Sequence, residues 1–320
     1  MPTATFSNPI VANGADPWVI MHNGRYYYCQ SCSNNSITVA VAERLEDLSS
    51  AEACLVWTAV EGTLYAWDVW APELHFLRGR WFIYFAADDG NNDNHRMYVL
   101  ESVTDDPQGA YCFKGQLAAP TDRWAIDGTV LELADGRLYF IWSGWEGFVN
   151  EQQNLYIAPM SDPCTISGER VCISVPEYPW ELNGGCPLIN EGPEVLMHGE
   201  KLHLIYSASG SWCDDYCLGQ LTFTGGDPLN RDAWVKKPTA VFARTDNVFG
   251  PGHASFTKSP DGTEDLIVYH SAKFSGAGWD RQVNMQRFTW DVEGNPVFGE
   301  PVAPGVEMAV PSSIHRQARL

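Results

Sequence analysis

Basic residues are scarce in this sequence: 20 Lys and Arg stand against 40 Asp and Glu, which gives a formal net charge of −20. A strongly acidic surface repels other polyanions, so neither nucleic acid nor an anionic membrane is expected as a partner. Long apolar runs are also missing, and no stretch approaches the length needed to cross a bilayer. The simplest explanation of the high negative charge is that it keeps the protein soluble, and we prefer this to a role in attracting a cation.

An export signal is not visible either. The start, Met1-Pro2-Thr3-Ala4-Thr5, lacks a basic region followed by an apolar one. A cytoplasmic location is therefore expected, although a secreted protein from which a leader had been removed would look the same.

The nine cysteines do not form a metal or redox pattern. Cys29 and Cys32 make a C-x-x-C pair and Cys213 and Cys217 lie four apart, but neither has a second pair at zinc-site spacing or a βαβ context. We expect reduced, partly buried thiols, which fits a reducing compartment.

Helical periodicity is almost absent, and residues 42–53 form the nearest candidate for a helix. Strand signals dominate instead: short runs rich in Tyr, Phe, Trp, Val and Ile are bounded by turns such as Asn23-Gly24, Asp89-Gly90 and Asp135-Gly136. The chain is therefore expected to be all-β.

A short pattern recurs five times along the chain. Its copies begin at Asp16-Pro17, Ala71-Pro72, Asp127-Gly128, Glu191-Gly192 and Pro251-Gly252, at steps of 55, 56, 64 and 60 residues. Each copy continues into an aromatic-rich run and then a further strand, as at residues 37–42, 97–100, 154–158, 219–223 and 283–288. Such a period indicates an array of like units that bury their faces against one another. We predict a single domain, residues 1–320, folded as a five-bladed β-propeller with about four antiparallel strands per blade.

Three of the five copies carry a carboxylate at or beside the same point. If the array closes into a ring, Asp16, Asp127 and Glu191 converge although more than fifty residues separate them. A carboxylate at Asp16, stiffened by Pro17, can act as a general base on water. Burial beside Asp127 would keep Glu191 protonated as an acid. Glu194 is a competitor, but its odd spacing from Glu191 places it on the opposite face of a regular strand.

Glycosidic hydrolysis requires two carboxyl groups, one that donates a proton to the leaving oxygen and one that takes a proton from water. Asp16 and Asp127, each taken alone, also fit an ordinary turn, and the three carboxylates together also fit a cation site. A propeller that binds carbohydrate without turnover is a further alternative, although retention of all three acids favours an enzyme.

These motifs resemble glycoside hydrolase family 43, five-bladed propellers that cleave arabinose- and xylose-containing glycans. The resemblance runs from Asn8-Pro9-Ile10 to about Pro296. Ala15-Asp16-Pro17 resembles the general-base motif of the family, Ile126-Asp127-Gly128 its pKa-modulating aspartate, and Glu191-Gly192-Pro193 its general-acid motif.

The resemblance extends to candidate substrate-binding residues. Trp70-Ala71-Pro72-Glu73 is similar to a motif whose tryptophan lies near the sugar pocket, and Arg281 matches an arginine that contacts the bound sugar. His253 corresponds to a histidine that faces the central channel and in some members ligates calcium or another ion, so it is a candidate metal ligand; an unliganded, hydrogen-bonded histidine is the alternative. No cofactor is implied for the chemistry.

Tryptophans near the heads of the blades are candidates for stacking on sugar rings, although a position in the core or at the rim is the more common role for all but Trp70, which its motif supports. They are Trp18, Trp70, Trp145 and Trp212, of which Trp70 and Trp145 are taken as substrate-binding. His75, His95, His198 and His270 show no supporting pattern and are interpreted as surface or strand residues.

The resemblance implies an inverting mechanism, with acid and base separated by roughly 6.5–9.5 Å to admit a water molecule. The motifs at Trp70 and His253 look most similar to those of exo-acting arabinofuranosidases. We therefore expect release of terminal α-L-arabinofuranosyl residues from arabinan or arabinoxylan oligosaccharides. A β-xylosidase or an endo-arabinanase of the same family is the alternative.

Overall fold

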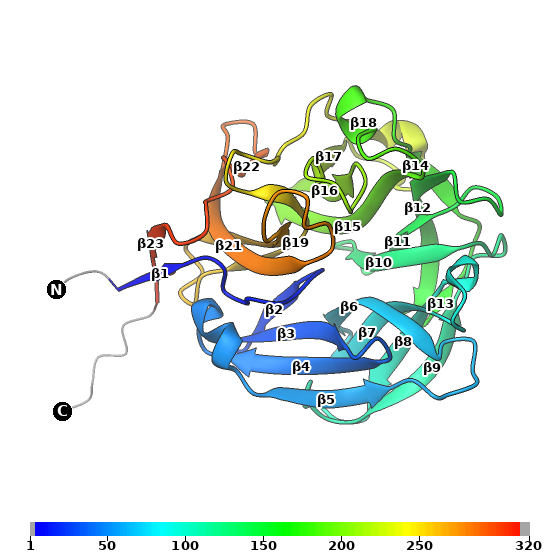
Figure 1. The fold of residues 1–320 in the computed structure, drawn as a ribbon. Helices are drawn as coiled ribbons and strands as arrows, with labels where there is room; N and C mark the ends of the chain where they lie inside the picture. The colour runs from blue at the N-terminus through cyan, green and yellow to red at the C-terminus, as the bar shows by residue number, and fades with distance from the viewer. Residues whose placement is uncertain (1–3, 314–320) are drawn as a thin grey trace.

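Five sheets are arranged around a central axis in the computed structural model, which describes residues 4–313 (Figure 1). We call the sheets blades 1 to 5 in chain order. Blade 1 contains β2 (Trp18–His22), β3 (Arg25–Cys32), β4 (Ser36–Ala42) and β5 (Ala53–Thr58). Blade 2 contains β6 (Trp67–Leu77), β7 (Arg80–Asp88), β8 (Arg96–Ser102) and β9 (Tyr111–Leu117). Blade 3 contains β10 (Ala125–Glu132), β11 (Leu138–Gly144), β12 (Gln152–Asp162), β13 (Thr165–Ile166) and β14 (Val171–Ser174).

The last two blades follow the same plan. Blade 4 contains β15 (Leu188–His198), β16 (Lys201–Ala208), β17 (Cys217–Phe223) and β18 (Trp234–Lys236). Blade 5 contains β19 (Phe249–Lys258), β20 (Asp265–Ala272), β21 (Arg281–Trp290) and β22 (Pro296–Val297). The predicted five-bladed propeller of about four antiparallel strands per blade is therefore confirmed.

Two features depart from five identical, separate sheets. The outer position of blade 3 is shared by the short strands β13 and β14, which both pair with β12. In addition, β12 and β15 form a short parallel pairing, with Gln152 opposite Leu188 and Gln153 opposite Ile189, so blades 3 and 4 are continuous.

The ring is closed by the N-terminal segment. Strand β1 (Thr5–Ser7) pairs antiparallel with β23 (Glu307–Ala309). Farther along, the Ile10 amide donates to the Val283 carbonyl of blade 5 at 2.8 Å, and the Asn8 side chain bonds both backbone groups of Met285. These bonds hold the start of blade 1 against blade 5.

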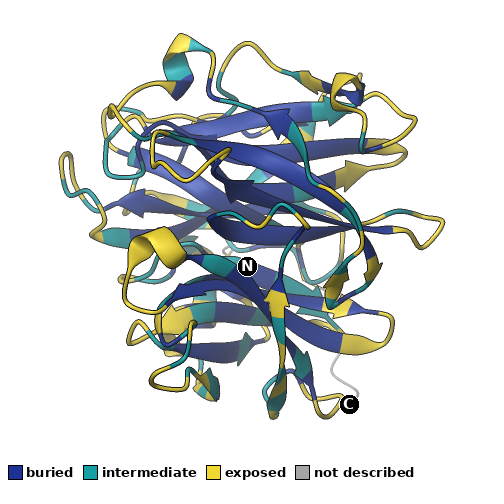
Figure 2. Ribbon diagram, turned by 90° about the vertical axis from the view of Figure 1, so that its right-hand side faces the viewer, coloured by how far each residue is buried: buried dark blue, intermediate teal, exposed yellow. Residues whose placement is uncertain are grey.

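The core consists of five apolar clusters, each shared by two neighbouring blades. The aromatic runs of the repeats supply much of it, including Tyr84, Phe140 and Tyr206. The inner strands are accordingly buried while the outer turns are exposed (Figure 2). Because each blade buries its faces only against its neighbours, no blade has a complete core of its own.

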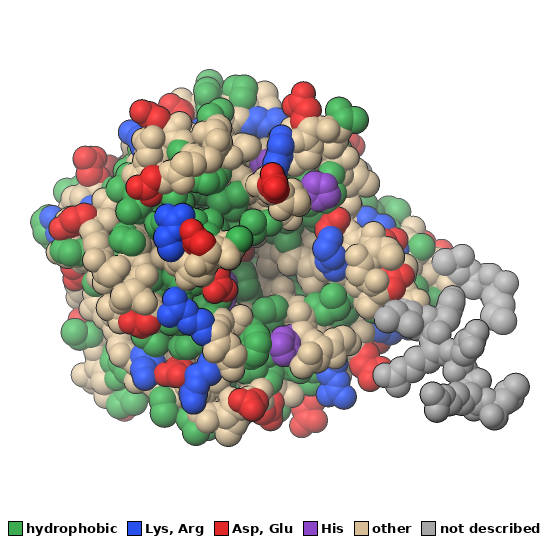
Figure 3. Space-filling model, turned by 180° about the vertical axis from the view of Figure 1, so that it is seen from behind, with side chains coloured by type: hydrophobic (Ala, Val, Ile, Leu, Met, Phe, Trp, Pro, Cys, Tyr) green, Lys and Arg blue, Asp and Glu red, His purple; other side chains and the backbone are tan. Residues whose placement is uncertain are grey.

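Helix is confined to short 3₁₀ turns in the described chain: η1 (Leu45–Ser50), η2 (Asn92–Asn94), η3 (Pro179–Glu181) and η4 (Arg231–Ala233). The candidate helix at residues 42–53 is thus only the turn η1. Among residues 4–313, no helix has the length and apolar character needed to cross a bilayer. The face turned away in Figure 1 is hollowed near its centre and carries charged side chains of both signs (Figure 3).

Every repeat has a residue with a left-handed backbone at an equivalent position near the start of the inner strand. These residues are Asp16, Ala71, Asp127, Gly192 and His253, with φ of 47°, 41°, 53°, 52° and 44°. In blades 2 to 5 the strand pairing shifts register at this point. Bulges re-aim side chains, and left-handed non-glycine residues persist only where the surrounding structure holds them.

The backbone also corrects the sequence alignment of the last two copies. That alignment matched Glu191 and Pro251 with Asp16, whereas the left-handed position is occupied by Gly192 in blade 4 and by His253 in blade 5. His253 is therefore the equivalent of Asp16 and Asp127, and all three lie at the same point of their inner strands.

Candidate active site

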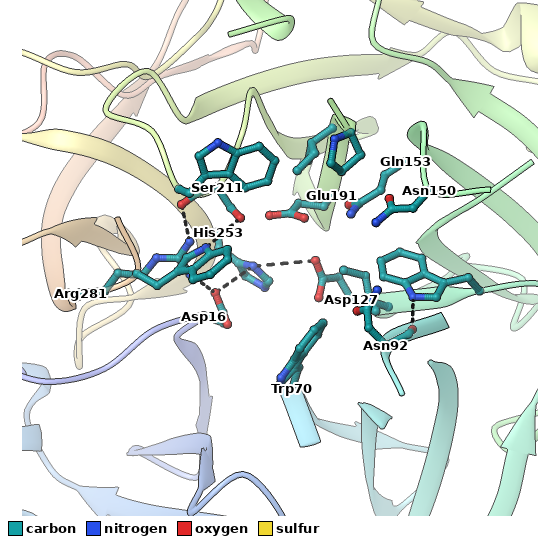
Figure 4. A pocket seen from close by; sticks show the side chains of 16 residues that line it. Asp16, Trp70, Asn92, Asp127, Asn150, Gln153, Glu191, Ser211, His253 and Arg281 are labelled. Atoms are coloured by element: carbon teal, nitrogen blue, oxygen red, sulfur yellow. Dashed lines mark hydrogen bonds and ion pairs between the residues drawn. The ribbon is translucent and has the colours of Figure 1, made fainter. Parts of the chain in front are cut away.

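A cavity of ≈ 440 Å³ lies where the inner strands begin, and side chains from all five blades line it (Figure 4). Its lining includes the three predicted acids and three of the predicted substrate-binding residues: Asp16, Asp127, Glu191, Trp70, His253 and Arg281. Other lining residues include Asn92, Trp124, Asn150, Gln153, Ser211, Trp212 and Trp279. The convergence expected from ring closure is thus present.

The carboxyl group of Asp16 lies among three cationic or imidazole groups. Its Oδ1 is 3.2 Å from Nδ1 of His253, 3.2 Å from Nδ1 of His270 and 3.3 Å from Nη1 of Arg281. Burial acts to raise the pKa of Asp16, but these three neighbours outweigh it and hold the pKa well below its usual range. Asp16 is therefore ionised throughout the neutral range.

Further contacts of Arg281 and His270 hold the guanidinium and the backbone of Asp16 in place. Arg281 also donates from Nη2 to the Ser211 carbonyl at 2.7 Å, which holds the guanidinium between blades 4 and 5. The backbone N–H of Asp16 donates to His270 Nδ1 at 3.1 Å. Burial and the nearby Arg281 lower the pKa of His270 to about 3, so this ring is neutral and can accept that bond.

Asp127 lies on the other side of His253 from Asp16 (Figure 4). Its Oδ2 accepts the backbone N–H of Gly192 at 3.1 Å and is 4.0 Å from Nδ1 of His253. Burial, together with the nearby Glu191 and Asp16 carboxyls, raises the pKa of Asp127 in spite of His253. The following Gly128 is required by packing, because a Cβ there would lie 2.2 Å from the ring of Phe140.

Glu191 belongs to β15 and points into the cavity from blade 4. Its Oε1 accepts a hydrogen bond from the hydroxyl of Tyr216 at 2.8 Å. Burial raises the pKa of Glu191, and the Tyr216 bond opposes that change only in part. Since Asp127 and Glu191 both have raised pKa values and interact, the pair favours holding a proton at neutral pH.

His253 stands between these groups. Burial acts to lower its pKa, but the carboxyls of Asp16, Asp127 and Glu191 raise it above its ordinary value. Within the described part of the chain, no group of three or more His, Cys, Asp or Glu side chains is arranged to hold a metal ion. A single imidazole already paired with Asp16 does not make a complete ion site, so binding of calcium or another ion at His253 stays a prediction.

The structure corrects the prediction for Trp145. This residue is 2% exposed and lies behind Trp124, whose ring stacks on it with centroids 4.9 Å apart. Trp124, anchored by a 2.7 Å bond from its Nε1 to the Asn92 carbonyl, lines the cavity in its place. Sequence spacing does not tell which of these two tryptophans lines the cavity.

The other tryptophan candidates divide in the same way. Trp70 and Trp212 line the cavity as expected. Trp18 instead packs on His75, with ring centroids 4.5 Å apart, and its Nε1 donates to the Leu74 carbonyl. It is therefore a packing residue between blades 1 and 2.

Several residues of the site were not identified from the sequence. His270 was interpreted as a surface or strand residue; it lies on β20, but it contacts Asp16 directly. Tyr216 and Trp279 lie in or beside loops, where no repeat marks them. His270 could have been found, since it ends the aromatic run of the fifth copy and pairs with Gly252, next to His253.

Glu194 does not follow the alternation expected of a regular strand. In the β15–β16 ladder Glu191 is opposite Ser207 and Glu194 is opposite Ile205, so three residues on β15 span two on β16. This bulge cancels the odd spacing and returns Glu194 to the face that Glu191 occupies. Glu194 nevertheless does not line the cavity.

Comparison with known proteins gives a consistent result. The family model described as glycosyl hydrolases family 43 matches residues 6–296. An extracellular exo-α-(1→5)-L-arabinofuranosidase of Streptomyces avermitilis is 36% identical over 318 residues, covering 95% of this chain and 65% of the relative. An α-L-arabinofuranosidase 43 of Humicola insolens is 33% identical over 317 residues, with the same two coverages of 95% and 65%. The chain thus spans slightly less than two thirds of the length of these two relatives.

Among solved structures, an α-L-arabinofuranosidase from Lactobacillus brevis superposes with a TM-score of 0.88 at 35% identity. The match covers 94% of this chain and 98% of that one. With the family match spanning most of the sequence and the same fold recovered, this chain belongs to glycosyl hydrolases family 43.

Proposed function

We propose that this protein is an exo-acting, inverting α-L-arabinofuranosidase. It would release terminal α-L-arabinofuranosyl residues from arabinan or arabinoxylan oligosaccharides. The observation that carries the proposal is the contrast within one cavity between Asp16, held ionised, and the Asp127–Glu191 pair, which favours holding a proton. A base and an acid on different sides of a sugar-sized cavity are what single-step hydrolysis requires.

In the proposed reaction, a water molecule attacks the anomeric carbon while the bond to the leaving oxygen breaks. Asp16 takes the proton of the water, and Glu191 gives its proton to the leaving oxygen. Asp127 keeps the acid protonated until it is needed. Arg281 orients the Asp16 carboxylate and His270 holds the Asp16 backbone, so little reorganisation is needed as charge develops.

The shape of the site supports exo action. Side chains from all five blades surround the cavity, which suits a pocket that accepts the end of a chain. Its volume of ≈ 440 Å³ is within the ordinary range of small-ligand pockets. The three relatives named above are all described as arabinofuranosidases, which favours arabinose over xylose as the released sugar.

The site of action follows the same relatives. The Streptomyces avermitilis protein is described as extracellular, so the expected cytoplasmic location has no support from it. We infer that this protein acts on oligosaccharides outside the cell. Secretion of the native protein into the culture medium of its source, measured by fractionation, is the test.

Product analysis by NMR with linear and branched arabino-oligosaccharides and with xylo-oligosaccharides tests the function itself. Release of β-arabinofuranose as the first-formed anomer, from chain ends only, is the expected result. Internal cleavage would indicate an endo-arabinanase, and release of xylose a β-xylosidase. Binding without turnover by the wild-type protein would mean that the propeller is a carbohydrate-binding module.

A further inference from the structure

A buried histidine packs against Trp70 from outside the cavity. His95 was expected at the surface or in a strand, but it is 0% exposed and lies between η2 and β8. Its ring stacks on that of Trp70, with centroids 4.0 Å apart and planes 28° apart. Trp70 lines the cavity and His95 does not, so the imidazole lies behind the tryptophan. The mechanism proposed above uses neither His95 nor its partner Asp88.

Both nitrogens of the His95 ring face acceptor atoms. Nδ1 lies 3.1 Å from Oδ2 of Asp88, whose side chain is also 0% exposed, and Nε2 lies 3.1 Å from the Asp68 carbonyl. The Asn92 carbonyl, 3.3 Å from Nδ1, already accepts from Trp124 at 2.7 Å. Carboxylates and carbonyls only accept hydrogen bonds, so the ring serves as a donor and Asp88 is its chief partner at Nδ1. We call Asp88 and His95 the buried dyad.

The dyad is held in place from both ends. Asp88 is the last residue of β7, and its Oδ1 accepts the backbone N–H of Gly90 at 2.8 Å, which leaves Oδ2 for His95. Burial acts to raise the pKa of Asp88, but the contact with His95 and the bond from Gly90 lower it, so the carboxyl is ionised at neutral pH. The His95 carbonyl accepts the backbone N–H of Ala125, the first residue of β10, at 3.2 Å. Blades 2 and 3 therefore fix the imidazole independently of Trp70.

Trp70 lies in an irregular part of β6. The pairing of β6 with β7 shifts register between Trp67 and Trp70 and again between Trp70 and Glu73. The nearby Asp68 and Ala71 have left-handed backbones, with φ of 49° and 41°. Register shifts of this kind re-aim side chains. The direction of the Trp70 ring therefore depends on what packs behind it, which is His95.

We propose that Asp88 and His95 are positioning residues that hold the ring of Trp70 in the orientation needed to stack on the bound sugar. The Asp88 carboxylate fixes the imidazole, and the imidazole supports one face of the indole. Neither residue lines the cavity, so the dyad acts on binding and not on proton transfer. The role in sugar binding rests on the function proposed above, but the packing of the three side chains does not.

Asp88→Asn tests the dyad with little change of shape. If the amide oxygen keeps the bond from Gly90, the amide NH2 group faces Nδ1 of His95, and two donors oppose each other. Kinetics on an arabino-oligosaccharide should show KM raised by roughly 2–13-fold, the worth of an aromatic stack, with kcat changed less than about twofold. His95→Gln keeps a donor but removes the ring, and should raise KM in the same way. An unchanged KM in either folded variant, or a fall in kcat alone, would overturn the proposal.

His198→Gln is the matched control. His198 stacks on Trp290 with centroids 4.1 Å apart and planes 16° apart, a pair much like His95 and Trp70, but neither of its members lines the cavity. Loss of this stack should leave KM unchanged. An equal rise in KM for His198→Gln would show a general loosening of the propeller, which contradicts a specific role for the dyad.

A double-mutant cycle tests whether the dyad acts through Trp70. In a Trp70→Ala background there is no ring to position, so Asp88→Asn should raise KM no further. A further rise as large as the one in the wild-type background would contradict the proposal.

The packing can be tested without activity. His95→Gln and Trp70→Ala remove two sides of one stack, so their effects on the free energy of unfolding should not add in the double variant. Additive losses would refute the supporting contact. Absence of turnover by wild type would refute the proposed function alone, because the unfolding measurements would still decide whether His95 supports Trp70.

Discussion

Nδ1 of His253 lies 3.2 Å from Oδ1 of Asp16 and 4.0 Å from Oδ2 of Asp127, although the chain separates His253 from each by more than a hundred residues. The histidine and the two aspartates occupy equivalent left-handed positions in blades 5, 1 and 3. The same left-handed backbone position in three blades therefore directs an imidazole and two carboxyls to the same point. Blade 4 places Gly192 at this position, and its backbone N–H donates to Asp127.

Replacement of Asp16 should remove the base. Asp16→Asn keeps the shape of the side chain but cannot take the proton of the water. Because general base catalysis contributes about 10²–10⁴-fold, kcat/KM should fall by at least about a hundredfold on substrates with good and poor leaving groups alike. Steady-state kinetics on aryl α-L-arabinofuranosides measures this. Activity within a few-fold of wild type would exclude Asp16 as the base.

Replacement of Glu191 should depend on the leaving group. Glu191→Gln cannot protonate the departing oxygen, and only poor leaving groups need that proton. We expect a loss of about 10²–10⁴-fold on oligosaccharides and a much smaller loss on activated aryl arabinofuranosides. An equal loss on both classes would contradict the assignment of Glu191 as the acid.

The dependence of activity on pH should reveal the proton that Asp127 and Glu191 share. The lowered pKa of Asp16 keeps the base ionised well into the acidic range, so activity is expected to persist there. The raised pKa values of Asp127 and Glu191 mean that the acid loses its proton only above the usual carboxyl range, and activity falls as the pH rises through them. Asp127→Asn removes one negative charge, so the alkaline limb of kcat should move to lower pH by about one unit. A limb that moved to higher pH would contradict the proposed role of Asp127.

Trp70 and Trp145 should behave differently when truncated. Trp70→Ala removes a ring from the cavity wall, and a stacking contribution of about 0.5–1.5 kcal/mol corresponds to a rise in KM of roughly 2–13-fold. Trp145→Ala instead leaves a hole beneath Trp124 and should lower the free energy of unfolding by about 3–5 kcal/mol. Kinetics and denaturant unfolding of both variants separate the two roles. A large rise in KM for a fully folded Trp145→Phe would restore Trp145 as a binding residue.

An ion at His253 can be tested by chelation. If calcium or another ion in the channel stabilises the ring, treatment with a chelator should lower the melting temperature, and addition of the ion should restore it. His253→Gln gives the comparison, since a variant without the imidazole should show no response to the chelator. A wild-type protein that melts at the same temperature with and without chelator would exclude a stabilising ion.

Much of the architecture is visible in the sequence because a repeat is local. Each copy contains its own strands and turns, so the period reveals five units before any contact between them is known. The strand segments expected at residues 37–42 and 283–288 lie within β4 and β21 for this reason. The three acids could be selected because they stand at or beside fixed places in the copies, and Trp70, His253 and Arg281 because their motifs resemble those of the family.

Tertiary structure alone decided which of the candidate residues reach the cavity. The alternation of side chains along a regular strand placed Glu194 on the wrong face. A bulge adds one residue to β15 that has no partner on β16, and nothing in the sequence marks this bulge. Trp145 lies behind Trp124 and His270 lies against Asp16 because blades and loops distant in sequence pack there. The sequence by itself determined the ring and the supply of carboxyls. Burial and neighbouring charges, which exist only once the ring has closed, decided which carboxyl is ionised and which holds a proton.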